Sequence, residues 1–221
     1  MTVLEVPGAR LYYETHGHGP LMIMVPGANG VAEGFRPVAE PLAAHYTVVL
    51  YDRRGFSRSR LDGPQDYSHR LRTDANDVRR LIEHISDEPA TVFGACSGAV
   101  VALELLTRHP AVVHTLVCFE PAAVLHLPNG RKWVEFFHEI YDHDRRTGIE
   151  PALATFREQT FPDTDRQAMV QAPNNQANTT YWFRTRAAPI SDSRTRPRCP
   201  PPACRPDRAG GRPANPGVPR P

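Results

Sequence analysis

The chain of 221 residues has no hydrophobic run near the roughly 20 residues that a membrane-spanning helix requires. No basic stretch followed by a hydrophobic block stands at its start, so we expect no secretory signal. Its four cysteines are too few and too scattered for a disulfide framework. We therefore expect a protein of the reducing cytoplasm that has no membrane partner.

Lysine is nearly absent, since Lys132 is the only one among 26 basic residues. Residues 191–221 hold seven arginines and two acids, a net charge of +5, which leaves −3 for residues 1–190 out of the total of +2. The body of the chain thus has no excess of positive charge with which to neutralise phosphates. We expect no nucleic-acid partner for it.

Residues 191–221 are also poor in apolar side chains. They contain nine of the 23 prolines, and Val218 is their only branched aliphatic residue. Such a segment cannot bury enough apolar area to offset the entropy of ordering, so a disordered tail is predicted. Cys199 and Cys204 lie in it without a neighbouring histidine, and we expect no zinc site there. As an alternative, a proline–arginine segment can dock on aromatic grooves or contact nucleic acid.

Residues before this tail show alternating strand and helix patterns. Two short runs around Pro7 and Gly8 predict a hairpin, and the continuous apolar run Leu21–Val25 is typical of a strand buried on both faces. The elements predicted next are a helix over 34–44, a strand over Thr47–Tyr51, a helix over 71–85, a strand over 91–93, a helix over Ser97–Arg108 and a strand over 112–119. This order predicts an α/β fold with a mostly parallel sheet and helices on both faces.

The pattern changes after Pro121. An amphipathic aromatic stripe over 133–141 predicts one helix, and Pro151 begins a second. We expect a helical lid over the carboxyl edge of the sheet, where open α/β sheets bind their ligands. The predicted domains are a core over 1–120, the lid over 121–190 and the tail over 191–221.

Residues 94–98, Gly-Ala-Cys-Ser-Gly, stand between a predicted strand and a predicted helix. That is the context of a nucleophile elbow, with Cys96 at its centre. Residues 26–30 (Pro-Gly-Ala-Asn-Gly) and 52–57 (Asp-Arg-Arg-Gly-Phe-Ser) each follow another predicted strand. Together the three segments resemble the α/β-hydrolase family: its elbow, its oxyanion loop with proline in place of histidine, and its D-x-R-G turn. The resemblance runs over about residues 3–121.

The resemblance implies covalent catalysis without a cofactor. Cys96, where the family usually has serine, would attack an ester, thioester or lactone carbonyl. The backbone N–H groups of Ala28 and Ser97 would form the oxyanion hole, and Asn29 would contact the substrate. A helix beginning at Ser97 is expected to lower the pKa of the thiol. The alternative is that Cys96 is only a small buried apolar residue.

The family orders its catalytic residues as nucleophile, acid and histidine. Glu120, after the strand that follows the elbow helix, is the acid candidate; alternatively it lines the pocket or anchors the lid. The family histidine comes late in the chain, but no histidine follows His143. His126, His138 and His143 do not match the motif, so the resemblance assigns the base to none of them.

Two interpretations therefore stay open. The first is a hydrolase of ester, thioester or lactone bonds acting through Cys96 on a small-molecule substrate. The second is a catalytically inactive, truncated hydrolase-like protein or binding module that lacks the triad histidine. The assay that separates them compares ester turnover by the chain and by a Cys96→Ala variant.

The last two strand–helix units of the family's fold have no counterpart after residue 190. Because arginine greatly exceeds lysine, the gene is expected to be GC-rich, and residues 191–221 have the composition of GC-rich DNA translated out of frame. We hypothesise a frameshifted tail, which gene sequencing would test. Loss of two strands predicts an exposed sheet edge and a homodimer formed through it. The glycosylation sequon that begins at Asn178 is expected to be a chance match.

Overall fold

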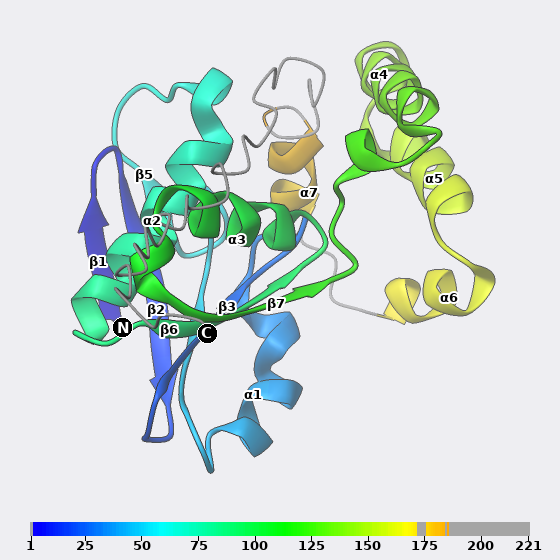
Figure 1. Cartoon of the computed structure of the whole chain (residues 1–221). Coiled ribbons are helices and arrows are strands. Elements are labelled where there is room, and N and C mark those ends of the chain that lie inside the picture. The colour runs from blue at the N-terminus through cyan, green and yellow to red at the C-terminus, as the bar shows by residue number, and fades with distance from the viewer. Residues whose placement is uncertain (1, 172–175, 184, 186–221) are drawn as a thin grey trace, which may run out of the picture.

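The protein, in a computed structural model, is described over residues 2–171, 176–183 and 185 (Figure 1). Its centre is a seven-stranded sheet in the order β1-β2-β4-β3-β6-β7, with β5 paired to β2 off this path. The strands are β1 (Thr2–Val6), β2 (Ala9–His16), β3 (Leu21–Val25), β4 (Thr47–Tyr51), β5 (Arg60–Leu61), β6 (Ala90–Ala95) and β7 (Val113–Phe119). The predicted tail over 191–221 lies outside the described residues.

Helices flank the sheet on both faces and extend beyond its end. They are α1 (Arg36–Leu42), α2 (Arg70–Ile85), α3 (Ser97–Arg108), α4 (Gly130–Thr147), α5 (Ile149–Thr160), α6 (Asp163–Gln171) and α7 (Gln176–Trp182). Single 3-10 turns lie at Ala32–Phe35, Tyr67–His69, Pro110–Val112 and Val124–His126. The α/β architecture predicted from the order of elements is confirmed.

The sheet is mixed, as predicted. β1 and β2 form the antiparallel hairpin, and β2 also pairs antiparallel with β4. From β4 onward the neighbours β4–β3, β3–β6 and β6–β7 are parallel. β3 lies at the centre of the parallel part, and all five of its residues are buried. A strand with a helix on each face needs apolar side chains on both sides, and this accounts for its unbroken apolar sequence.

One apolar core lies on each face of the sheet. α2 and α3 cover one face, with Val78, Leu81 and Leu105 fully buried against the strands. α1 covers the other face, where Ala39 packs against Met24 and Leu50. Parallel strands joined through helices place all their carboxyl ends at one edge of the sheet, and the loops that follow β3, β4 and β6 meet there.

α4 to α7, called the α4–α7 group below, follow β7, and α4 and α5 pack on each other beyond the end of the sheet (Figure 1). Phe156 of α5 is the centre of the group: the ring stacks on Phe136 of α4 with 6.3 Å between centroids and also meets Trp182 and Phe183 at the end of α7. The predicted aromatic stripe therefore packs into a small core. α4 and α5 match the sequence expectation, whereas α6 and α7 were not predicted because their sequences are mainly polar.

β7 is an edge strand of the described sheet, bonded to β6 only. It carries no Lys, Arg, Asp or Glu, and on it Val117 is 42% and Phe119 56% exposed. Charged residues on an edge strand normally discourage pairing with another chain. An uncharged strand with exposed apolar side chains fits antiparallel pairing with β7 of a second copy, and the homodimer stays a prediction.

Replacing Val117 by lysine is expected to convert such a dimer into a monomer, since two ammonium groups would be brought close together in the paired strands. Light scattering coupled to gel filtration measures the change. The matched control is Val3→Lys, because Val3 is 48% exposed on β1 at the opposite edge. A wild-type protein that is monomeric at every concentration would contradict the prediction.

Candidate active site

Cys96 lies in a sharp turn between β6 and α3, with φ 51° and ψ −120°. A non-glycine residue rarely adopts a positive φ, so surrounding contacts must maintain this conformation. The Cys96 N–H donates to the carbonyl of Phe119 at 2.9 Å, and the Cys96 carbonyl accepts from Ala99 N at 3.1 Å and Ala122 N at 3.2 Å. The strand–turn–helix context predicted for the elbow is present, and the Cys96 side chain is exposed rather than part of the core.

The elbow glycines permit close backbone contacts. A Cβ on Gly98 would lie 2.2 Å from the carbonyl oxygen of Val25, and one on Gly94 would lie 2.7 Å from Ala99 Cα. Neither space admits a side chain without moving backbone. The elbow therefore packs directly on the end of β3, from which residues 26–30 continue.

Residues 26–30, the segment predicted to form the oxyanion hole and called the oxyanion loop below, lie beside Cys96. A Cβ on Gly27 would be 3.2 Å from Cys96 Cβ, so Ala28 follows a residue that lies against Cys96. The loop is a tight turn closed by Gly30 N–H donating to the Gly27 carbonyl at 3.1 Å. Asn29 is exposed at its tip. The structure thus brings together the two segments that hold Ala28 and Ser97.

Arg53, which was not predicted from the sequence, connects the 26–30 loop to Ser97 at the start of α3. Its Nη1 donates to the carbonyls of Pro26 at 3.3 Å and Gly27 at 3.1 Å and to Ser97 Oγ at 3.2 Å. Its Nη2 donates to Asp74 Oδ2 at 2.6 Å, and both side chains are at most 5% exposed. The available sequence clue was Asp74, which with Asp77 is one of two carboxylates on the mainly apolar face of α2.

Asp52 supports the same loop from the next strand. Its Oδ1 accepts from Ala32 N at 2.9 Å, and Arg58 Nε donates to its Oδ2 at 2.7 Å. The Asp52 side chain is fully buried, and these donors supply hydrogen bonds to both of its carboxylate oxygens. The D-x-R-G turn therefore supports the oxyanion loop, and we assign none of its side chains a part in the reaction with the substrate.

The environment of the Cys96 thiol raises its pKa above the ordinary 9.0. Desolvation by the surrounding protein is the largest cause, and the charge of Glu120 adds to it. The Ser97 N–H and the charge of Arg53 act in the opposite direction but are weaker. The Ser97 N–H at the helix terminus thus acts in the expected direction, but the expected net lowering of the pKa is wrong, because desolvation outweighs it.

The rate at which iodoacetamide alkylates Cys96 is expected to rise about tenfold per pH unit up to about pH 9, since the thiolate reacts and its fraction grows tenfold per unit below the pKa. Site-resolved mass spectrometry after timed quenching measures it. Cys118 is the internal control, because burial also raises the pKa of its thiol and it is only partly accessible. A plateau already below about pH 8 would show a stabilised thiolate and contradict the prediction.

Glu120 follows β7 directly and has φ 44°, a second strained position next to the elbow. Its carboxylate is close enough for its charge to raise the pKa of Cys96. The structure thus brings Glu120 and Cys96 into one site. No hydrogen bond from Glu120 to a histidine occurs among the described residues, so its assignment as triad acid stays a prediction.

No histidine in the described ranges is bonded to Cys96 or is among the charges that shift its pKa. Four of the ten histidines hydrogen-bond elsewhere: His69 with Asp66, His84 with Tyr13, His109 with Asn76 and His114 with Thr115. The ring of His16 lies 3.5 Å from the carboxylate of Glu14. In the described ranges the Cys96 turn and the 26–30 loop thus lie together, and no histidine is hydrogen-bonded to Cys96.

Comparison with known proteins settles the family. The model of the alpha/beta hydrolase fold matches residues 20–199. The chain belongs to the α/β-hydrolase fold family. The matched range includes the elbow, the D-x-R-G turn and the α4–α7 helices.

Curated relatives of this α/β hydrolase are longer than the chain. An uncharacterized hydrolase, YraK of Bacillus subtilis, is 39% identical over 182 residues, which are 81% of this chain and 64% of that protein. The zearalenone hydrolase of Bionectria ochroleuca is 31% identical over 132 residues, 58% of this chain and 50% of that enzyme. The chain thus spans less than two thirds of each. Both relatives are hydrolases.

Solved structures show the same fold. An alpha/beta hydrolase of Sphaerobacter thermophilus matches with a TM-score of 0.59 and 25% identity over 80% of this chain and 68% of that one. An epoxide hydrolase of Bacillus megaterium matches with a TM-score of 0.59 and 19% identity over 83% of this chain and 71% of that one. The second likeness concerns the fold alone.

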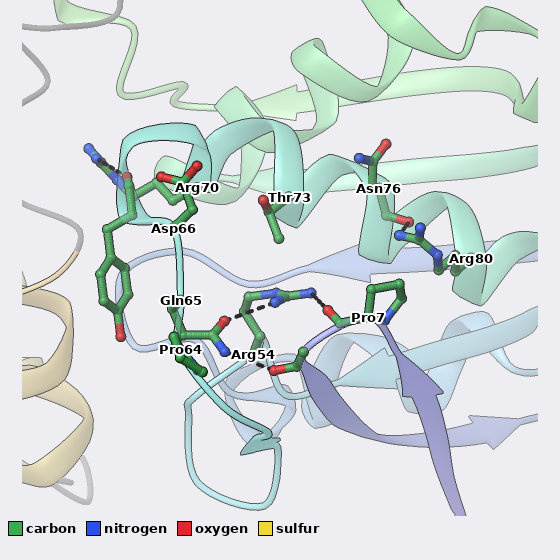
Figure 2. Close-up of a pocket in the computed structure, with 11 residues that line it drawn as sticks. Pro7, Arg54, Pro64, Gln65, Asp66, Arg70, Thr73, Asn76 and Arg80 are labelled. Atoms are coloured by element: carbon green, nitrogen blue, oxygen red, sulfur yellow. Dashed lines mark hydrogen bonds between the residues drawn. The ribbon is translucent and has the colours of Figure 1, made fainter.

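The depression found on the surface of this α/β hydrolase lies outside the elbow. A polar depression of about 360 Å³ lies between the β1–β2 turn, the loop at Pro64–Gln65 and α2, and none of the predicted site residues lines it (Figure 2). In the described ranges no cluster of three or more His, Cys, Asp or Glu side chains can hold a metal ion. None of the described helices is long and apolar enough to cross a membrane.

Proposed function

We propose that the protein accepts an acyl group on Cys96 from an ester, thioester or lactone, as the first half of a hydrolase reaction. The observation that carries the proposal is the accessible thiol at a positive-φ turn, with the Ser97 N–H directed at the sulfur and the oxyanion loop against it. Hydrolases among the relatives support the reaction class.

In the proposed reaction the Cys96 thiolate adds to the carbonyl carbon and forms a C–S bond. The carbonyl oxygen takes the negative charge and accepts hydrogen bonds from Ala28 and Ser97 N–H. Collapse of the tetrahedral intermediate breaks the bond from the carbonyl carbon to the leaving group, C–O in an ester or lactone and C–S in a thioester, and the departing alkoxide or thiolate takes a proton from water. Water then hydrolyses the thioester to a carboxylic acid and restores the thiol. Asn29 contacts the substrate, and α4–α7 act as a lid over it.

A second candidate function is a binding module that keeps the pocket but does not turn over. The specific observation in its favour is that the described residues place no histidine at Cys96. Without a base, the thioester would form only through the thiolate already present, and its hydrolysis would be slow.

Nitrophenyl acetate tests both candidates. The measurements are nitrophenolate release and the intact mass of the protein over time. Release well beyond one equivalent supports the hydrolase, and one equivalent with a stable acetyl adduct supports acyl transfer without turnover. Absence of both release and adduct at any pH would contradict the proposal and favour the binding module.

A further inference from the structure

Asn178 joins the α4–α7 group to the active-site loops. Its Oδ1 accepts from Ser57 N at 3.0 Å, and its Nδ2 donates to Ser57 Oγ at 2.9 Å and to the carbonyl of Asn29 at 3.4 Å. The side chain is only 5% exposed although it comes from a helix at the surface of the sheet domain. Burial of this amide therefore depends on partners in two loops that lie far away in sequence.

Tyr181, one turn further along α7, packs on the same loops. Its ring meets Phe56 edge to face with 5.0 Å between centroids, and a Cβ on Gly55 would lie 2.4 Å from the Tyr181 ring. Phe56 in turn lies under the oxyanion loop, since a Cβ on Gly30 would fall 2.2 Å from its ring. α7 thus contacts the loop in two ways. Asn178 hydrogen-bonds to Asn29, and Tyr181 packs edge to face on Phe56, which in turn lies against Gly30.

The loop position matters because Ala28 is the residue between the two fixed points. Arg53 holds the carbonyl of Gly27 on the Cys96 side, and the Arg53 backbone N–H donates to the Gly30 carbonyl at 2.7 Å. On the side of α7, the described residues show Asn29 held by Asn178. The residues on either side of Ala28 are therefore both held by side chains: Arg53 binds the carbonyl of Gly27, and Asn178 binds the carbonyl of Asn29.

We propose that Asn178 is a positioning residue of the oxyanion hole, through which the α4–α7 group aligns the Ala28 N–H with the carbonyl that Cys96 attacks. This inference rests on the proposed acylation of Cys96. It also gives the Asn-Thr-Thr sequon a structural role, because the Asn178 amide is buried and bonded rather than open to modification.

The test compares two reactions of the same thiol. Acylation by nitrophenyl acetate passes through an oxyanion, whereas alkylation by iodoacetamide does not. Asn178→Asp keeps the oxygen that accepts from Ser57 but puts an oxygen in place of the amide that donates to Asn29. We expect acylation to fall about 10- to 100-fold, as for a misplaced oxyanion donor, and alkylation to stay within about twofold.

Asn129→Asp is the matched control, because Asn129 is exposed before α4 and its side chain makes no capping bond. It should leave both rates unchanged. Thermal unfolding checks that each variant is folded, and Asn178→Ala provides a second variant that removes both functions of the amide. Amide hydrogen exchange in residues 27–31 gives an independent readout, with faster exchange expected in both Asn178 variants.

The outcomes separate the two proposals. A wild-type protein that is alkylated but never acylated refutes the proposed function, while hydrogen exchange still decides whether Asn178 holds the loop. Equal acylation of wild type and Asn178→Asp, with unchanged exchange, overturns the positioning role and leaves the function intact. Parallel losses of acylation and alkylation would also overturn it, because they indicate a general loss of access to the thiol.

Discussion

Replacing Cys96 by alanine is expected to lower nitrophenyl acetate acylation by at least about a thousandfold, to the level of buffer, and to remove the acetyl adduct from the intact mass. Cys96 is the cysteine at the elbow and is an exposed residue, whereas Cys118 is half-buried. The thiolate supplies the electron pair of the new C–S bond, and alanine has none. Stopped-flow absorbance of nitrophenolate and peptide mapping measure the two effects.

Cys118→Ala is the control for this loss. Cys118 lies on β7 with its thiol directed at the carbonyl of Ala99, 3.9 Å away, so its removal should leave acylation unchanged. Cys96→Ser adds a sharper comparison. A hydroxyl needs a base to remove its proton before it attacks. Since no histidine among the described residues is hydrogen-bonded to residue 96, the serine variant should also be nearly inactive. Multiple turnovers by Cys96→Ser would show that a base reaches this position.

Arg54→Ala is expected to lower the free energy of unfolding by about 3–5 kcal/mol, the effect of leaving a buried charge without its partner. Arg54 Nε and Nη2 donate to the two carboxylate oxygens of Asp77 at 2.7 Å each, and both side chains are at most 6% exposed. Arg54 also donates to Gln65 Oε1 and to the carbonyl of Pro7, which ties three segments together (Figure 2). Urea unfolding followed by circular dichroism measures the change.

The loss of unfolding free energy in Arg54→Ala should increase with pH. Burial raises the pKa of Asp77 to about 6, and Arg54 opposes that rise. Without Arg54 the pKa of Asp77 goes higher still, so the variant stays protonated at pH values where the wild type is ionised. Below about pH 6 both proteins carry the proton, and the difference in stability is smallest. It should grow as the pH rises from there.

Two further variants test the cause. Arg54→Met combined with Asp77→Leu removes both charges and should recover much of the lost stability, since an apolar pair replaces an ion pair without leaving an orphan. Arg10→Ala removes an exposed arginine that pairs with Asp62 and should change little. A loss from Arg54→Ala no larger than that from Arg10→Ala would contradict the role assigned to the buried pair.

The sheet and its flanking helices were predictable because their sequences carry the pattern of burial. Leu21–Val25 and Thr47–Tyr51 are strands with the predicted bounds, and Ser97–Arg108 is the predicted helix. In these segments apolar side chains mark the faces that pack. α7 lacked such a pattern: its contacts with the active-site loops come from Asn178 and Tyr181, whose partners cannot be read from the sequence.

The site was predictable to the level of the motif but not of its electrostatics. The elbow was predicted from its place between a strand and a helix, and the resemblance to the family pointed to the oxyanion loop and to Glu120; the structure brings these segments together. The hydrogen bonds of Arg53 to Gly27 and Ser97 could not be predicted from the sequence. An arginine in a turn is usually solvated, and only the fold shows that this one is buried beside the two segments. The raised pKa of Cys96 also required the structure, since desolvation depends on neighbours far away in sequence.

The contacts of Asn178 have a consequence for the order in which the protein is made. Its bonds to Ser57 and to Asn29 close loops of 121 and 149 residues. Contacts of such separation form late, after the local strand–helix units have folded. On the ribosome the elbow and the oxyanion loop leave the exit tunnel first and wait for α7. The oxyanion hole is therefore expected to be the last part of the described chain to mature during synthesis.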